Sequence, residues 1–224
     1  MTADARLTAV CAGRPESRGV DDAADPLARP WLSAIWKTPL AGPVQVHRTG
    51  VGGDEHADTR VHGGPEKAVL AYALDHYAAW AEVLDPRELG PGAFGENLAV
   101  EGLDECSVAI GDVWAVGSAR LQVAQPRGPC WKLARKFRRQ DLVAEVIENG
   151  RTGWYLRVLA EGALEAGDAV TVVDRPHPDL TLAKLHRVLY ENRIDEGDAR
   201  AFATCAALAD GLRQRVADKL EQRP

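Results

Sequence analysis

The sequence predicts a mainly β protein with helices, in which a β-barrel-like domain over residues 1–175 precedes a small three-helix domain over residues 176–224. Short apolar or alternating runs, typical of strands, recur up to residue 175 and are separated by glycine and proline clusters. A Gly-Asp turn that feeds a β-branched strand occurs at both Gly111 and Gly167, as expected for hairpin entries. After the linker-like stretch Arg175–Asp179, apolar residues recur with a helical period.

The first half of the chain is predicted to alternate strands with two long loops. Gly13–Pro30 is rich in Arg, Asp, Gly and Pro and is expected to be a mobile polar loop. Gly50–Lys67 is dense in Gly, Asp and His, and a loop of this length is usually functional or disordered. Asp75 is expected to cap a helix that runs to Val83. The expected strands are Leu7–Ala12, Trp31–Trp36, Val44–Val46 and Ala68–Ala73.

The second half is predicted to complete the sheet and then to become helical. Expected strands are Glu96–Val100, a hairpin over Trp114–Val123 with a Gly-Ser turn, Trp154–Leu159 and Ala169–Val173. Two helices, Lys132–Phe137 and Asp141–Glu148, are expected between them. The three tail helices are marked by Leu182–Leu189, Ala201–Leu208 and Leu212–Leu220.

Composition and charge narrow the class of protein. Hydrophobic residues make up 46% and charged residues 27% of the 224 residues, which is ordinary for a globular protein. The net charge of −6 argues against a nucleic-acid binder, which would be basic. No apolar run has the length that spans a bilayer, and the N-terminus lacks a secretory apolar core. The four cysteines are scattered without a Cys-x-x-Cys pair, so we expect reduced thiols in the cytoplasm.

The segment Gln125-Pro-Arg-Gly-Pro-Cys-Trp-Lys-Leu133 carries the clearest chemical signal. Its two prolines are expected to end the sheet, and Pro129 suits the first position of a helix. Cys130 would then lie at a helix N-terminus between Arg127 and Lys132, and both effects would lower the pKa of its thiol. A thiolate is either a nucleophile or a soft metal ligand. The alternative is that Cys130 is a small buried hydrophobe.

Two glycine-containing motifs are further candidates. In His62-Gly63-Gly64-Pro65-Glu66-Lys67, the glycines allow close backbone approach to a ligand and Lys67 could meet a phosphate. The alternative is a glycine-rich turn with a surface lysine. In Phe94-Gly95-Glu96-Asn97, the polar side chains could hydrogen-bond a heterocycle, or the segment is an ordinary turn into a strand.

Two charged clusters have weaker signals. Asp54, Glu55, His56 and Asp58 are residue types that bind divalent ions, but their spacing matches no known metal motif, so we interpret them as a solvated loop. The basic run Lys132, Arg135, Lys136, Arg138 and Arg139 is typical of a solvated face, although its first members could form an anion pocket beside Cys130. Neither a Walker loop, a dinucleotide fingerprint nor a Ser-His-Asp set is visible.

Taken together and in this order, the motifs resemble the MOSC family, which is named for the C-terminal domain of molybdenum-cofactor sulfurases, and most of all its stand-alone YiiM-type members. The resemblance spans roughly residues 50–173, and the tail is similar to the three-helix domain of that branch. The residues that carry it are Gly53-Asp54-Glu55, Val61-His62-Gly63-Gly64-Pro65, His76-Tyr77-x-x-Trp80, Phe94-Gly95-Glu96-Asn97-Leu98, Ile110-Gly111-Asp112 and Gln125-Pro126-Arg127-x-Pro129-Cys130-x-Lys132-Leu133.

The resemblance implies a MOSC β-barrel-like fold that binds the molybdenum cofactor, with Cys130 as a ligand of molybdenum or a carrier of sulfur. It implies reduction of N-hydroxylated compounds, including hydroxylaminopurine-type base analogues, and hence a role in detoxification. Pyridoxal phosphate binding is also associated with the family. Our hypothesis is an oxidoreductase in which Cys130 anchors molybdenum and His62, whose imidazole ordinarily titrates near about pH 6.5, donates protons.

The remaining site residues are assigned to the cofactor or the substrate. Gly63, Gly64 and Lys67 would hold the pterin phosphate, Asn97 and Gln125 would orient the pterin or substrate beside Phe94, and Arg127 and Lys132 would neutralise an anionic cofactor. Trp131 would wall the pocket or belong to the core. Because no flavin or iron–sulfur motif is present, we expect a separate electron-donor protein. The alternatives are a sulfur carrier with a Cys130 persulfide and a non-catalytic cofactor carrier, and a homodimer is left open.

Overall fold

The structure is a computed structural model that describes residues 5–59, 62–191 and 195–222. Its centre is an eight-stranded sheet in the order β13-β9-β10-β11-β7-β8-β1-β4. These strands are β1 (Arg6–Ala12), β4 (Thr38–Pro39), β7 (Val69–Ala73), β8 (Leu98–Glu101), β9 (Val113–Val116), β10 (Ala119–Pro126), β11 (Trp154–Ala160) and β13 (Thr171–Asp174). The pair β7–β8 is parallel, and the other neighbours in this sheet are antiparallel.

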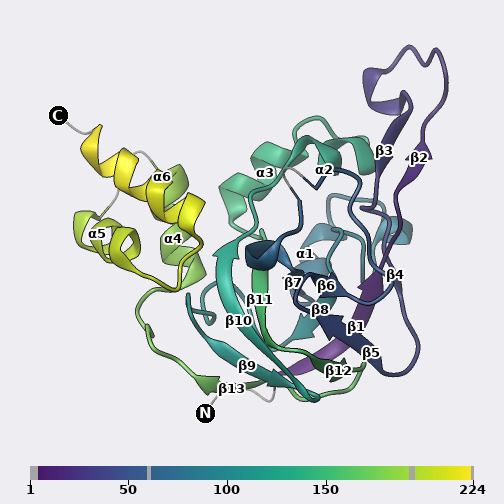
Figure 1. The fold of residues 1–224 in the computed structure, drawn as a ribbon. Coiled ribbons are helices and arrows are strands. Elements are labelled where there is room, and N and C mark those ends of the chain that lie inside the picture. Colours follow the sequence, from purple (N-terminus) through teal and green to yellow (C-terminus); the bar gives the residue numbers. More distant parts are fainter. Residues whose placement is uncertain (1–4, 60–61, 192–194, 223–224) are drawn as a thin grey trace.

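Hydrogen bonds between opposite ends of this sheet curl it into a barrel-like shape (Figure 1). The backbone N–H of Leu7 in β1 donates to the carbonyl of Asp168 at 2.9 Å, and the N–H of Val170 donates to the carbonyl of Ala5 at 2.8 Å. Asp168 and Val170 lead into β13, so the two ends of the sheet meet there. The predicted mainly β, barrel-like fold is therefore confirmed. Two smaller sheets add β12 (Gly162–Leu164), β5 (Val44–His47) and β6 (Gly50–Val51), and β2 (Glu16–Arg18) with β3 (Trp31–Ser33).

The hairpin β9–β10 leads to the candidate site and forms as predicted. Its turn uses Gly117 at φ 53°, where a Cβ would lie 2.3 Å from the carbonyl oxygen of Ala163. The sheet ends at the first proline as expected, since Pro126, which pairs with Trp154 of β11, is the last residue of β10. Strand β9 pairs with β10 only as far as Gln122, so on that side of β10 no strand lies opposite Pro126 that would need its missing N–H.

The segment Gly13–Pro30 was wrongly predicted to be a loop throughout. It contains β2, which pairs with β3, and a short 3-10 helix η1 (Pro26–Ala28) whose first turn is capped by Asp25. The strand was missed because its charged side chains face solvent and leave no apolar alternation. Figure 1 shows this hairpin extending away from the barrel on the side opposite the C-terminal helices. The strand expected over Trp31–Trp36 ends at Ser33.

Short helices lie around the ends of the sheet, and several begin or end at other residues than predicted. They are η2 (Pro65–Lys67), α1 (His76–Trp80), η3 (Pro86–Glu88), α2 (Trp131–Lys136) and α3 (Leu142–Asn149). Asp75 precedes α1 but makes no side-chain capping hydrogen bond, and the helix is shorter than expected. The placement of Pro129 at the first helical position was also wrong, since α2 begins at Trp131 and Cys130 is its N-cap residue.

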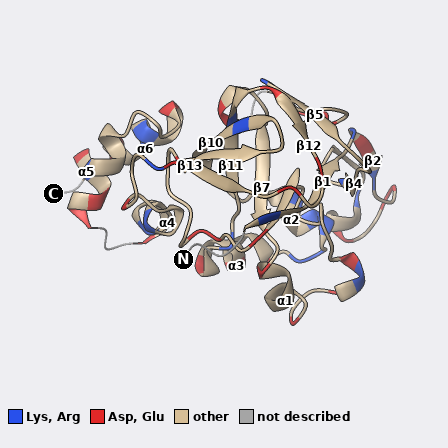
Figure 2. Cartoon of the chain, turned by 90° about the horizontal axis from the view of Figure 1, so that it is seen from below, with Lys and Arg blue, Asp and Glu red and all other residues tan. Residues whose placement is uncertain are grey.

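Three helices follow the barrel, as predicted: α4 (Leu182–Tyr190), α5 (Glu196–Thr204) and α6 (Asp210–Glu221). Helix α5 begins before the expected Ala201 because the carboxylate of Asp195 accepts a hydrogen bond from the N–H of Asp198. The three lie together on one side of the barrel (Figures 1 and 2), yet Leu185 of α4, Phe202 of α5 and Val216 of α6 belong to the same apolar cluster as the barrel interior. The domain boundary at residue 175 stays a prediction.

No helix in the described ranges has the length and apolar character needed to cross a membrane.

Candidate functional site

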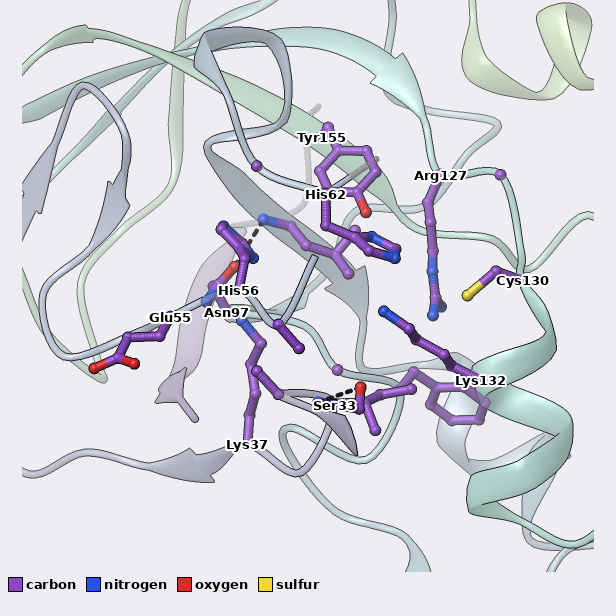
Figure 3. A pocket seen from close by; sticks show the side chains of 18 residues that line it. Ser33, Lys37, Glu55, His56, His62, Asn97, Arg127, Cys130, Lys132 and Tyr155 are labelled. Carbon is purple, nitrogen blue, oxygen red and sulfur yellow. Dashed lines mark hydrogen bonds between the residues drawn. The ribbon is translucent and has the colours of Figure 1, made fainter. Parts of the chain in front are cut away.

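A cavity beside α2 brings together residues from four distant parts of the chain (Figure 3). Its volume is about 70 Å³, and we call it the Cys130 cavity. Ligand pockets that enclose a whole small molecule are larger, roughly 300–1,000 Å³. The Cys130 cavity therefore has room for a metal ion or a small reacting group, and a ring system attached to either would lie outside it. Its polar and ionisable lining residues include Ser33, Lys37, Glu55, His56, His62, Asn97, Arg127, Cys130, Lys132 and Tyr155.

Cys130 reaches the cavity because strand β10 ends at Pro126 and a four-residue connection, Arg127–Cys130, leads into α2. The thiol is half-buried and is not in a disulfide. Figure 3 shows its sulfur pointing toward the guanidinium of Arg127. A sulfur held at the edge of a cavity among cations is accessible as a ligand or a nucleophile. The alternative of a small, fully buried hydrophobe is wrong.

Arg127 and Lys132 flank Cys130, and with it they form what we call the open wall. Arg127 is only 6% exposed, and within the described part of the chain its buried Nη1 has no hydrogen-bond partner. Lys132 points into the same space, and it forms no ion pair with a carboxylate of the described residues. A buried cation without a partner is costly unless something anionic completes it. The open wall is therefore suited to hold an anion.

Lys37 and Asn97 line the opposite side, and both contact Asp54, which does not itself line the cavity; we call these three residues the paired wall. Lys37 forms a buried ion pair with Asp54, and the side chains are 6% and 3% exposed. Asp54 also accepts hydrogen bonds from the backbone N–H of Gly13 at 2.9 Å and from Nδ2 of Asn97 at 2.9 Å. Burial lowers the pKa of Lys37, and Asp54 opposes this shift. The interpretation of the Asp54–Asp58 segment as a solvated loop was wrong for Asp54.

Asn97 is bound to its own barrel. Its Oδ1 accepts from the N–H of Leu70 at 3.1 Å, and its Nδ2 donates to the carbonyl of Cys11 at 3.2 Å as well as to Asp54. These bonds use its amide groups to hold β7, β1 and the paired wall together. Asn97 lines the cavity, but its side chain acts as a scaffold and not as the free ligand donor that we expected.

Two histidines lie between the walls. Gly63 has φ 81°, and a Cβ there would lie 2.6 Å from Cδ2 of His56, so the glycine allows the imidazole to pack against the backbone. Burial lowers the pKa of His56, with a contribution from Lys37. Burial, followed by the charge of Lys132, lowers the pKa of His62 to about 4. His62 is thus neutral near pH 7 in the free protein, whereas an unperturbed histidine would be partly protonated at that pH.

Lys67 and Gln125 do not line the Cys130 cavity. They lie in an adjoining space of about 360 Å³ between the barrel and helices α4 and α6, which we call the interdomain hollow. Nε2 of Gln125 donates to the carbonyl of Glu66 at 3.1 Å. The cavity and the hollow share His62, Arg127, Gly128 and Tyr155. The residues that we had assigned to one cofactor pocket are therefore divided between two adjacent spaces that share part of their lining.

Three other expected residues have different surroundings. Phe94 lines the cavity but is fully buried, and its ring stacks on Tyr72 at 4.7 Å. Gly64 has φ 85° at the start of η2 and lines neither space. Trp131 is 53% exposed and contacts Trp31 at 5.3 Å, so neither expected role, pocket wall or core, was right. Val61 of the motif lies outside the described residues.

The basic run after Cys130 is only partly a solvated face. Nζ of Lys136 donates to the carbonyls of Ile35 and Gly92, each at 3.3 Å, and burial lowers its pKa to about 8. Arg139 pairs with Asp141 and Glu145 at the surface.

Comparison with known proteins agrees with this architecture. The sequence model of the MOSC domain matches residues 58–171, about half of the chain. The chain belongs to the MOSC family. It is 38% identical over 190 residues to the uncharacterized protein YflK of Bacillus subtilis, which covers 85% of this chain and 86% of that protein.

Other MOSC relatives extend the comparison to a solved structure and to an enzyme. The crystal structure of YiiM from Geobacillus stearothermophilus has a TM-score of 0.78 and 32% identity, covering 96% of this chain and 99% of that one. A protein named reductase from Gibberella moniliformis is 39% identical over 165 residues, which are 72% of this chain and 29% of that protein. The resemblance found in the sequence is thus confirmed for the family, with YiiM as a structural relative.

The MOSC site of this chain fits an anionic group with a soft metal. The buried Nη1 of Arg127 lacks a partner among the described residues, and Cys130 offers sulfur next to it. Among the described residues, no three His, Cys, Asp or Glu side chains converge to hold a metal ion by themselves. A metal bound here would have to bring further ligands with it, as the dithiolene of a molybdenum cofactor does. Arg127, Lys132 and Cys130 are the residues that would hold such a group.

Proposed function

We propose that this protein is a molybdenum-cofactor-dependent oxidoreductase that reduces N-hydroxylated compounds, with the cofactor held at the open wall. The observation that carries the proposal is the buried, unpartnered guanidinium of Arg127 beside the Cys130 sulfur. The buried cation would be stabilised by an anion, and the sulfur is a ligand suited to a soft metal. Membership of the MOSC family and the similarity to a reductase support the same chemistry.

The reaction is a two-electron reduction in which R–NHOH, two electrons and two protons give R–NH₂ and water. When bound, the cofactor would supply the two-electron chemistry. The N–O bond breaks, and the nitrogen and the departing oxygen each need a proton. We expect the electrons to come from a separate electron-donor protein, since the sequence has no flavin or iron–sulfur motif.

The residues of this chain hold the reacting groups and supply protons. Cys130 would anchor the metal, while Arg127 and Lys132 would neutralise the anionic cofactor. His62 lies between them, and its pKa of about 4 belongs to the free protein. An anion in the cavity would raise this pKa, because it would offset the charge of Lys132, and would make the imidazole a better proton donor. Tyr155 adds a hydroxyl whose pKa burial raises, so it stays protonated and can donate a hydrogen bond.

The decisive test is elemental analysis of protein produced in a host that makes the molybdenum cofactor. We expect molybdenum in the wild type, with reduction of an N-hydroxylated purine when a reduced dye supplies electrons. Cys130→Ala should lose the metal and lower the rate at least 100-fold. Cys106→Ala, at an exposed cysteine outside the cavity, is the matched control and should retain both.

Two outcomes would contradict the proposal. A wild type without molybdenum that carries one extra sulfur on Cys130 by mass spectrometry would identify a sulfur carrier. A wild type that retains molybdenum but reduces no N-hydroxylated compound with a competent donor would identify a cofactor carrier.

A further inference from the structure

The interdomain hollow is separated from the Cys130 cavity only by a wall that both spaces share. His62, Arg127, Gly128 and Tyr155 line both, so a molecule in the hollow lies against the same residues as a group in the cavity. The hollow has a volume of about 360 Å³, compared with about 70 Å³ for the cavity. It reaches the size of pockets that enclose a small molecule, and the cavity does not. A ring system therefore fits the hollow while its reactive substituent fits the cavity.

The far side of the hollow is formed by the C-terminal helices and carries a flat platform. Tyr190 is the last residue of α4, and the guanidinium carbon of Arg215 from α6 lies 5.6 Å from the centre of its ring. Arg215 is exposed and, within the described ranges, forms no ion pair with a carboxylate. The guanidinium joins α6 to α4 through the ring of Tyr190, and being exposed it can also contact a ligand. Aromatic rings and guanidinium planes are the surfaces on which heterocyclic bases stack.

The other sides of the hollow combine apolar and polar groups in the manner of a ring-binding pocket. Leu189 and Leu212 line it, and Gln125 contributes its amide. Because Nε2 of Gln125 is used by Glu66, its Oε1 is the atom that remains to accept a hydrogen bond from a ligand. Glu66 is itself engaged by Arg157 at 2.8 Å and by the N–H of Asp210 at 3.1 Å. The one carboxylate among the lining residues is therefore already hydrogen-bonded within the protein, and its negative charge is balanced by Arg157 and does not repel an electron-rich ring.

We propose that the interdomain hollow binds the planar heteroaromatic ring of the substrate, with the guanidinium of Arg215, which lies over the ring of Tyr190, against its face and the N-hydroxyl group directed past His62 toward Cys130. The three-helix bundle thereby determines specificity for ring-bearing substrates. Reduction of that ring's substituent rests on the proposed function, whereas binding of the ring itself does not.

The test measures binding of adenine, as an unreactive planar purine, to cofactor-free protein by ligand-observed NMR and calorimetry. We expect wild-type protein to bind adenine, and Arg215→Ala to weaken binding by about tenfold, the size of one stacking contact. Tyr190→Leu should weaken it similarly, while Tyr190→Phe, which keeps the ring, should bind as wild type does. Arg213→Ala is the matched control, because Arg213 lies on the same helix but pairs with Asp210 and lies outside the hollow.

Unchanged binding in Arg215→Ala and Tyr190→Leu would overturn the proposal, as would loss of binding in Arg213→Ala to the same degree. A protein that binds neopterin but not adenine at this platform would assign the hollow to the cofactor's ring and equally overturn it. In the loaded enzyme, Arg215→Ala should raise KM for a hydroxylaminopurine with little change in kcat. If no reduction occurs at all, the adenine measurements still stand, so failure of the reaction and failure of the ring site are distinguished.

Discussion

The two walls of the Cys130 cavity carry similar residues in opposite states. On the paired wall, Lys37 is bound to Asp54, and Asn97 connects Asp54 to the barrel. On the open wall, Arg127 is equally buried but lacks a described partner for Nη1. The difference separates two uses of buried charge: one wall is complete in the protein alone, and the other is complete only with a ligand. Residues of the first should affect stability, and those of the second should affect binding.

The largest effect on stability is expected from Lys37→Met. This change leaves the carboxylate of Asp54 buried without its cation, which should lower the free energy of unfolding by about 3–5 kcal/mol. Urea denaturation measures it. The double variant Lys37→Met/Asp54→Asn removes both charges and should recover part of the loss. A single variant as stable as the wild type would contradict the paired wall.

Asn97→Ala should have the next largest effect. It leaves the N–H of Leu70 and the carbonyl of Cys11 without their side-chain partner, and each unsatisfied buried group costs about 1–3 kcal/mol. The midpoint of thermal unfolding should fall accordingly. Gln214→Ala, at an exposed helix position, serves as the control and should change stability by less than about 0.5 kcal/mol.

Arg127→Met should behave in the opposite way and so sharpen the contrast. Because the described structure gives the guanidinium no side-chain bond to lose, we expect the free energy of unfolding to stay within about 1 kcal/mol of the wild type or to rise. Stabilisation by added phosphate, measured as a shift in Tm, should be lost. A loss of stability as large as that of Lys37→Met would show that the two walls are alike.

The last effect, which is absent at pH 7, is the pH dependence of His62. An unfolded histidine titrates near about pH 6.5, and His62 in the fold titrates at about 4. Between these values the unfolded chain binds more protons, so stability is complete above pH 6.5 and falls as the pH decreases toward 4. NMR titration should find this low pKa in free protein and a higher one when phosphate is present. An unchanged pKa with phosphate would mean that the anion does not reach the cavity.

The open wall could be predicted from local sequence patterns, whereas the paired wall could not, because it is formed by long-range contacts. Arg127, Cys130 and Lys132 are close in sequence, so their proximity followed from spacing alone. Lys37, Asp54 and Asn97 come from separate segments, and charged residues in polar loops indicate solvent unless the fold buries them. His56 was assigned to the same solvated loop as Asp54, and Tyr155 was missed because it lies in a strand that is distant in sequence from Cys130. A signal for Tyr155 existed, since pairing β10 with β11 places it opposite Gln125.

The barrel, its hairpins and the three helices followed from apolar periodicity, because burial of alternate residues leaves a direct trace in the sequence. Strand β2 left no such trace, since its side chains are exposed or half-buried. The lack of a pattern in the sequence also explains why the division of the site into two spaces was not predicted. Lys67 and Gln125 face the helices, and nothing near them in sequence indicates which element lies opposite.

Arg127 belongs to both spaces, and this has a consequence for the order of events. Whichever molecule arrives first takes up the positive charge that the second would otherwise meet. The affinities of the two occupants are then thermodynamically linked, and the factor by which one alters the other is the same in both directions. A single side chain would in this way make binding in one space depend on whether the other is occupied.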